Sequence, residues 1–240
     1  MPAVFVHGVP ETHVIWDPIR SHLSRKDVVA VDLPGFGAPL PAGFDATKEA
    51  YAAWLTAEIE KIGEPVDIVG HDWGSLLILR VASTRPDLIR TWTGGSGAIH
   101  PDYVWHDMAR MWQTPEVGEQ VMKAMTADAL KAALIGAGVP QAAADELASQ
   151  IDDTMKDCIL KLYRSAVNVG KEWDPELSNI PARGLLIWGA DDPYMAISYA
   201  DALARRTGAT LLALSQTGHW WPLQQPEEAA AALQDHWAQM

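Results

Sequence analysis

The chain has 240 residues, 48% of them hydrophobic, which suits one large domain or a core with an insertion and is enough to bury a substantial core. A net charge of −13 argues against a nucleic-acid partner, whose phosphates it would repel, and no apolar run approaches the ~20 residues of a membrane span. The single cysteine, Cys158, cannot form an intrachain disulfide, and together with the absence of a signal-peptide pattern it favours a cytoplasmic location.

The first part of the chain alternates short apolar runs with helical patterns. The apolar runs predict strands over 3–6, 28–31, 66–70 and 89–93. A helix begins near Trp16, a second follows Thr47 as its cap and ends at Gly63, and a third runs to Thr84 before Arg85-Pro86. This alternation is typical of a parallel sheet covered by helices on both faces.

The alternation stops after residue 97 and resumes near residue 184. Between Ile99 and about Ile180 the sequence predicts only helices, including 127–134, 141–149 and 152–167. A strand over 184–188, a helix over 197–206, a strand over 210–214 and a helix over 227–237 then follow. We therefore expect a core formed by 1–97 and 181–240, with 98–180 as a helical cap over the carboxyl edge of the sheet.

The segment 66–75 predicts a buried strand, a sharp turn and the start of a helix. Gly70 and Gly74 lie two residues either side of Asp72, so that a strained turn can present this side chain above the sheet edge. This is the pattern of a nucleophile elbow with Asp in the place of Ser. A carboxylate can displace a leaving group from a saturated carbon, which leaves an ester that water must cleave.

Cleavage of such an ester needs a base, and the turns after the last two predicted strands supply candidates. Asp191 and Asp192 follow the strand that ends at Trp188, and His219 follows the strand that ends at Leu214. A histidine oriented by a carboxylate can activate water. The order nucleophile, acid, histidine is the one used by α/β-hydrolases.

Five short motifs carry a resemblance to a known family: His7-Gly8-Val9-Pro10 with Trp16, 32–37 (Asp-Leu-Pro-Gly-Phe-Gly), Gly70-His71-Asp72-Trp73-Gly74, 189–192 (Gly-Ala-Asp-Asp), and Gly218-His219-Trp220 before Pro226-Glu227. The chain resembles the α/β-hydrolase family, specifically its Asp-nucleophile branch of epoxide hydrolases and haloalkane dehalogenases, and is most similar to the epoxide hydrolases.

The resemblance implies an α/β-hydrolase fold: a mostly parallel sheet with helices on both faces, a helical cap insertion, and no cofactor. The chain starts at the family's third strand, which implies that the N-terminal strands of the usual eight-stranded sheet are missing. The resemblance points to Asp192 as the acid, three residues past Gly189, with Asp191 as the second choice. It also implies an oxyanion hole formed by the N–H groups of Val9 and Trp73, and a cis Pro10.

The leaving group separates the two branches. Opening an epoxide needs a hydroxyl that protonates the ring oxygen, whereas a halide needs only N–H dipoles, for which indoles suffice. Residues 162–165 (Leu-Tyr-Arg-Ser) resemble the epoxide-hydrolase lid motif and assign ring opening to Tyr163. Met111 stands where the family's second lid tyrosine is expected, so Tyr103 or His106 is left as a substitute.

We predict an epoxide hydrolase that uses Asp72, Asp192 and His219 on a small apolar epoxide and water, as a monomer or homodimer. The first alternative is a haloalkane dehalogenase, in which Trp105, Trp112 or Trp173 adds a second indole to Trp73. The second is a protein that binds small molecules without turnover.

Two other chemistries are disfavoured. The acidic and histidine side chains between His100 and Asp107 match no helical metal motif and are explained by a solvated cap entrance. Ser96 is not followed by the apolar helix that a serine elbow requires.

Overall fold

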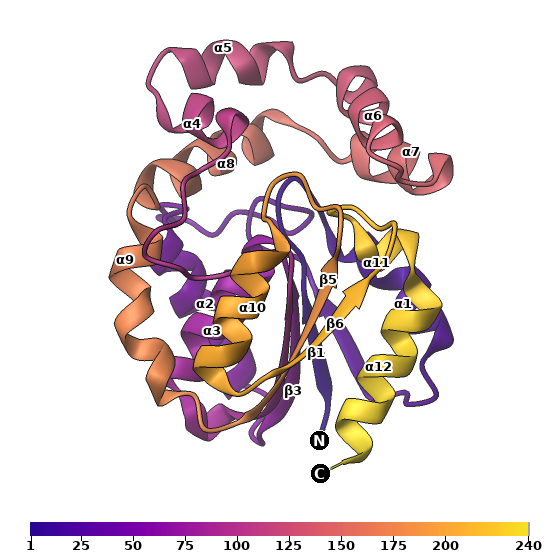
Figure 1. Cartoon of the computed structure of the whole chain (residues 1–240). Helices are drawn as coiled ribbons and strands as arrows, with labels where there is room; N and C mark the ends of the chain where they lie inside the picture. Colours follow the sequence, from indigo (N-terminus) through magenta and orange to yellow (C-terminus); the bar gives the residue numbers. More distant parts are fainter. Residues whose placement is uncertain (240) are drawn as a thin grey trace.

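The apolar runs of the sequence form one parallel sheet in the computed structural model, which describes residues 1–239 (Figure 1). Met240, the last residue of the predicted segment 181–240, lies outside the described residues. The six strands found in 1–239 are β1 (Ala3–Val6), β2 (Val28–Val31), β3 (Val66–His71), β4 (Ile89–Gly95), β5 (Arg183–Gly189) and β6 (Thr210–Leu214). They lie in the order β2-β1-β3-β4-β5-β6, so their carboxyl ends share one edge. The predicted α/β class is confirmed.

Strand β4 is longer than predicted. The prediction ended it at Thr93, but the strand continues through Gly94 and Gly95, which pair with Gly70 and His71 of β3. A Cβ atom at residue 95 would lie 2.4 Å from the carbonyl oxygen of Ile187, so a side chain has no room there. Glycine weakens a strand in general, but here the close approach of β5 requires it.

Helices cover both faces of the sheet, as expected. One face carries α2 (Lys48–Glu60), α3 (Trp73–Thr84) and α10 (Ile197–Thr207), and the other carries α1 (Asp17–His22), α11 (Trp221–Gln224) and α12 (Pro226–Ala238) (Figure 1). The Thr47 hydroxyl caps α2, and Gly63 follows that helix with a φ of 78°. Short 3₁₀ turns stand at His13–Trp16 and Pro86–Leu88. Within 1–239, no helix combines the length and the hydrophobicity that crossing a bilayer would require.

Helices alone connect β4 to β5 within the described chain. They are α4 (Asp107–Gln113), α5 (Val117–Ala124), α6 (Ala127–Gly136), α7 (Gln141–Ser149), α8 (Asp153–Ser165), α9 (Val169–Trp173) and the 3₁₀ helix η3 (Asp174–Asn179). Helices α4 to α8 lie over the carboxyl edge of the sheet, and α9 leads back along the side of the core (Figure 1). The turn after β3 therefore faces this helical segment. That 98–180 forms a separate cap domain stays a prediction.

Candidate active site

Asp72 occupies a strained turn between β3 and α3. Its backbone has φ 49° and ψ −120°, which is unfavourable for any residue with a Cβ atom. A Cβ atom at Gly70 would lie 2.4 Å from the carbonyl oxygen of Gly74, and one at Gly74 would lie 2.1 Å from that of Val6. The two glycines thus permit a turn too tight for other residues, and this turn presents the Asp72 carboxylate at the sheet edge.

The Asp72 side chain is 18% exposed, and backbone groups hold one of its oxygen atoms. The N–H of Val9 donates a hydrogen bond of 2.9 Å to Oδ2. Burial raises the pKa of Asp72, while the nearby His219 and the backbone N–H of Trp73 act in the opposite direction. The peptide bond between Val9 and Pro10 is cis, as the resemblance implied. Both predicted oxyanion-hole donors therefore lie beside this carboxylate.

His219 lies between the Asp72 and Asp192 carboxylates. Its Nδ1 is 2.9 Å from Oδ2 of Asp192, and its Nε2 is 3.7 Å from Oδ1 of Asp72. The other oxygen of Asp192 accepts hydrogen bonds from the backbone N–H groups of Tyr194 and Met195. Asp191, the second choice of the sequence, is exposed. Asp192 is thus the carboxylate that orients the imidazole.

The imidazole of His219 and its neighbouring carboxylates favour one another's charged forms. Burial lowers the pKa of His219, but the carboxylates of Asp192, Asp72 and Glu11 outweigh burial and raise it to about 9. Burial raises the pKa of Asp192, yet His219 and the two backbone N–H groups lower it overall. At neutral pH the site therefore holds an imidazolium between two carboxyl groups.

Both predicted tyrosines lie in the same region. Tyr163, on α8, is buried and packs edge-to-face on Trp73 with ring centroids 5.6 Å apart. Burial and the charge of Asp72 raise the pKa of Tyr163 well above its ordinary value, against a hydrogen bond with the Trp73 side chain. The hydroxyl of Tyr103 donates to the carbonyl oxygen of Tyr194 at 3.2 Å.

Two adjoining cavities open onto Asp72. The first, here called the inner cavity, has about 20 Å³ of space, and the second, here called the apolar channel, has about 170 Å³. Five residues line both: Asp72, His106, Tyr163, Tyr194 and His219. The remaining lining of the apolar channel is hydrophobic: Val9, Pro10, Met108, Trp112, Met125, Leu130, Ala133, Leu134 and Trp220. None of the described residues that line either cavity is Lys or Arg.

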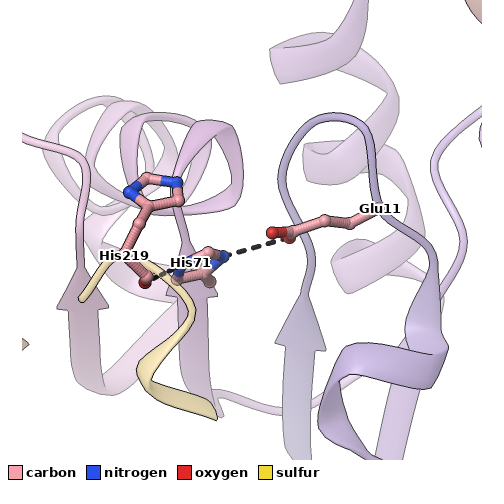
Figure 2. A group of neighbouring side chains, drawn as sticks. All are labelled: Glu11, His71 and His219. Carbon is pink, nitrogen blue, oxygen red and sulfur yellow. Dashed lines mark hydrogen bonds and ion pairs between the residues drawn. The ribbon is translucent and has the colours of Figure 1, made fainter. Parts of the chain in front are cut away.

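The sequence analysis missed a buried pair behind His219. Glu11 and His71 have no exposed side-chain surface, and the Nδ1 atom of His71 lies 3.0 Å from Oε2 of Glu11 (Figure 2). The Nε2 atom of His71 donates to the carbonyl oxygen of His219 at 2.9 Å, because a carbonyl can only accept. Burial raises the pKa of Glu11, but His71 lowers it overall. The pair thus fixes the backbone of the residue that carries the candidate base.

Glu11, His71 and His219 also have the composition of a metal site, since one ligand atom of each lies within 4.8 Å of the others. Both ring nitrogens of His71 are already engaged, however, with Glu11 and with the His219 carbonyl. We therefore interpret the group as a hydrogen-bond network. The hydroxyl of Ser96 donates to the same carbonyl at 3.2 Å, which gives this serine a structural part.

A parallel sheet with an acid at a strained strand-to-helix turn, opposite a histidine and a second acid, defines a hydrolase fold with a nucleophile elbow. Residues 3–232 match the model of the "Alpha/beta hydrolase family". The chain belongs to this family.

Three comparisons illustrate the range of relatives. The chain is 24% identical to an (E)-2-((N-methylformamido)methylene)succinate hydrolase of Acinetobacter baylyi, over 97% of this chain and 89% of that relative. An epoxide hydrolase from Vigna radiata is 20% identical, over 100% of this chain and 92% of its own, with a TM-score of 0.83. A haloalkane dehalogenase from Bradyrhizobium elkani is 21% identical over 100% and 91%, with a TM-score of 0.81. At such identities the structural likeness shows the fold, which hosts several chemistries.

Proposed function

We propose that the protein hydrolyses small apolar epoxides to vicinal diols through an ester on Asp72. The observation that carries this proposal is the arrangement of the Asp72 carboxylate. Its Oδ2 is held by the Val9 N–H, whereas its Oδ1 faces the Nε2 atom of His219 at 3.7 Å. One oxygen is thus kept in a hydrogen-bonding pocket, and the other is left to react.

In the first step, Oδ1 of Asp72 attacks a ring carbon of the epoxide. The new C–O bond forms as the ring C–O bond breaks, and the electron pair of that bond passes to the ring oxygen. The hydroxyl of Tyr163 supplies the proton for this oxygen. Tyr163 suits this part because it is buried and, like Asp72, lines both cavities. Within the described residues, its hydroxyl donates no hydrogen bond.

In the second step, the His219 imidazolium returns a proton to the Tyr163 phenolate, and the neutral imidazole then removes a proton from water, which attacks the carbonyl carbon of the ester. The developing negative charge falls on Oδ2, which already accepts a hydrogen bond from Val9 and lies beside the N–H of Trp73. The Nδ1–H of His219 points at Asp192, so the carboxylate stabilises the imidazolium as it forms. Collapse of the intermediate breaks the C–O bond of the ester, and the leaving diol oxygen takes the proton of His219. The carboxylic acid formed on Asp72 then gives its proton to His219, which restores the carboxylate and the imidazolium.

The lining of the cavities favours an uncharged substrate. A carboxylate substrate would find no Lys or Arg among the described lining residues, and it would face the negative charge of Asp72. The apolar channel instead matches a hydrocarbon group. This argues against the succinate-type substrate for which the Acinetobacter relative is named.

The second candidate is a haloalkane dehalogenase, which one contact favours. The indoles of Trp73 and Trp105 stack with centroids 6.0 Å apart and 21° between their planes, and both line the inner cavity. Two indole N–H groups suffice for a halide. Tyr163 packs edge-to-face on Trp73, with ring centroids 5.6 Å apart, so the same place also offers the hydroxyl that an epoxide needs, and this supports the epoxide as the first choice.

The experiment that tests the proposal is covalent trapping. We expect His219→Gln to accumulate the ester, detected by intact-mass spectrometry as protein plus substrate after incubation with styrene oxide or 1-bromobutane. The exposed His22→Gln serves as the matched control and should turn over normally. The double variant Asp72→Ala/His219→Gln should gain no mass.

Heavy-oxygen water completes the test. Over several turnovers the wild-type protein should place the label in Asp72, because water attacks the ester carbon. Absence of both adduct and label with every substrate tried, while the protein still binds the epoxide, would leave only a binding protein. Label in the diol alone would indicate direct attack by water and would refute the nucleophile.

A further inference from the structure

Trp105 closes one end of the candidate active site. It lies between β4 and α4, is half-buried, and lines the inner cavity. Its indole stacks on that of Trp73 and contacts the rings of Tyr103 and Tyr163, at centroid distances of 5.2 and 5.3 Å. The hydroxyl of Tyr103 is in turn held by the carbonyl oxygen of Tyr194. Contacts with three aromatic rings therefore fix the position of Trp105.

A surface groove begins directly behind Trp105. Residues 100–105 and 167–171 line this groove, which has about 350 Å³ of space. A Cβ atom at Gly170 would lie 2.2 Å from the carbonyl oxygen of His100, so the two walls of the groove meet there through their backbones. Four residues line both the groove and the inner cavity: Tyr103, Trp105, Val169 and Gly170. Trp105 is the largest side chain of this partition, and behind it lies a much larger space.

The two cavities that open onto Asp72 differ greatly in capacity. A space of about 10–15 Å³ holds one water molecule, so the inner cavity, with about 20 Å³, admits a group of roughly that size. A cavity of about 150 Å³ can bind benzene, so the apolar channel, with about 170 Å³, accepts a phenyl ring. Met108 lines the channel and is 39% exposed, so a longer substituent can extend toward the surface.

The cavities also lead away from Asp72 in different directions. Apart from the five residues that line both, they have no lining residue in common among the described residues. The inner cavity continues toward Trp105 and Val169, whereas the apolar channel continues between the cap helices toward Leu134. A large substituent therefore fits on one side of Asp72 only.

We propose that Trp105 restricts the protein to epoxides that carry a large apolar substituent on one ring carbon and only hydrogen or a methyl-sized group on the other. This inference rests on the proposed function and defines the substrate class of that site. The epoxide ring lies over Asp72, where the cavities meet, and the substituent occupies the apolar channel. A second large substituent, trans to the first, would point into the inner cavity and overlap the indole.

The experiment is a competition between styrene oxide, which has one phenyl group, and trans-stilbene oxide, which has two. Both epoxides are incubated with the wild-type protein in one mixture, and chromatography of the two diols gives the ratio of their kcat/KM values. A single methylene that does not fit a pocket changes this ratio by about 10-fold to 200-fold. We therefore expect the wild-type protein to prefer styrene oxide by about 100-fold or more.

Trp105→Ala joins the inner cavity to the surface groove and should lower this preference by about 10-fold or more. The matched control is Trp112→Ala, because Trp112 lines the apolar channel and its ring also contacts that of Tyr163, at 4.7 Å. Both variants withdraw one aromatic contact from Tyr163, which affects the two epoxides alike. Trp112→Ala should thus leave the preference nearly unchanged. If Trp105→Ala does not fold, Trp105→Leu keeps an apolar side chain and should shift the preference in the same direction by a smaller factor.

Three results would overturn the inference. The wild-type protein could hydrolyse both epoxides with similar kcat/KM values, or the Trp105 variants could keep the preference of Trp112→Ala. The third is a folded Trp105→Leu that turns over neither epoxide, which would give the indole a part in the chemistry instead. In all three cases the wild-type protein still forms the diol of styrene oxide, so the proposed function stands. If the wild-type protein forms no diol from either epoxide, the proposed function fails, and this inference falls with it.

Discussion

Replacing Asp192 by Asn tests the charge arrangement around His219 most directly. The substitution keeps the size of the side chain and removes its negative charge, and the histidine loses the carboxylate 2.9 Å from Nδ1. Of the groups that raise the pKa of His219, Asp192 has the largest effect. We therefore expect the imidazole to become a weaker base and to lose its fixed tautomer.

The size of the loss follows from the pKa of His219. The difference between the ordinary 6.5 and about 9 corresponds to about 3.4 kcal/mol of preference for the imidazolium. The transition state for ester hydrolysis forms this imidazolium, so its full loss would slow hydrolysis by at most about 300-fold, because Asp72 is an uncharged ester at this step and no longer raises the pKa of His219. Burial opposes the carboxylates, so their combined effect exceeds the net difference, and Asp192 supplies the largest part of it.

The assay is single-turnover kinetics with quenched samples, in which intact mass reports both formation and decay of the ester. We expect Asp192→Asn to form the ester at a rate near that of the wild-type protein and to hydrolyse it more slowly, by up to about 300-fold. Asp191→Asn removes the same charge at the neighbouring exposed position and should leave both rates unchanged. If the two variants behave alike, or if only ester formation slows, the assigned role of Asp192 is wrong.

Three further predictions use the same geometry. Tyr163→Phe should lower ring opening of styrene oxide by about 100-fold or more and change release of bromide from 1-bromobutane by less than about 10-fold; equal effects in initial-rate assays would deny Tyr163 its part as proton donor. Gly8→Ala would place a Cβ atom 2.5 Å from Oδ2 of Asp72 and should abolish ester formation, whereas Gly136→Ala, with open space at its Cβ position, should not. The raised pKa of His219 stabilises the fold fully below pH 6.5, and this stabilisation is lost as the pH rises through about 9. The free energy of unfolding of the wild-type protein should therefore fall by about 3 kcal/mol more than that of His219→Gln over this interval, as urea titrations would measure, and parallel curves would contradict the assigned pKa.

The central strands were predictable because burial on both faces leaves a continuous apolar run in the sequence. The run at 3–6 is buried throughout and matches β1 residue for residue. The run at 210–214 also matches the edge strand β6, although that strand is only partly buried. The prediction failed at the end of β4, where glycine serves a contact between strands that are far apart in the sequence. Periodicity carries local information, and such a contact depends on the assembled sheet.

The places of Asp72, Asp192 and His219 were predictable for the same reason, since each follows the carboxyl end of a strand in one parallel sheet. The pair of Glu11 and His71 was not, although Glu11 follows the predicted turn directly and His71 precedes Asp72. Sixty positions separate them, and no sequence pattern near either residue indicates that they form a pair. A charged residue in an apolar turn is the only local signal that such a partner exists.

One charge links the two proposed steps. The Asp72 carboxylate raises the pKa of Tyr163 and contributes to the raised pKa of His219. When Asp72 becomes an ester, its charge disappears, so both pKa values must fall. Tyr163 then becomes a stronger acid while the ring oxygen gains electrons, and His219 more readily becomes the neutral base that the following step requires. Ester formation at Asp72 thus prepares both neighbouring groups for the chemistry that completes the cycle, without any movement of the chain.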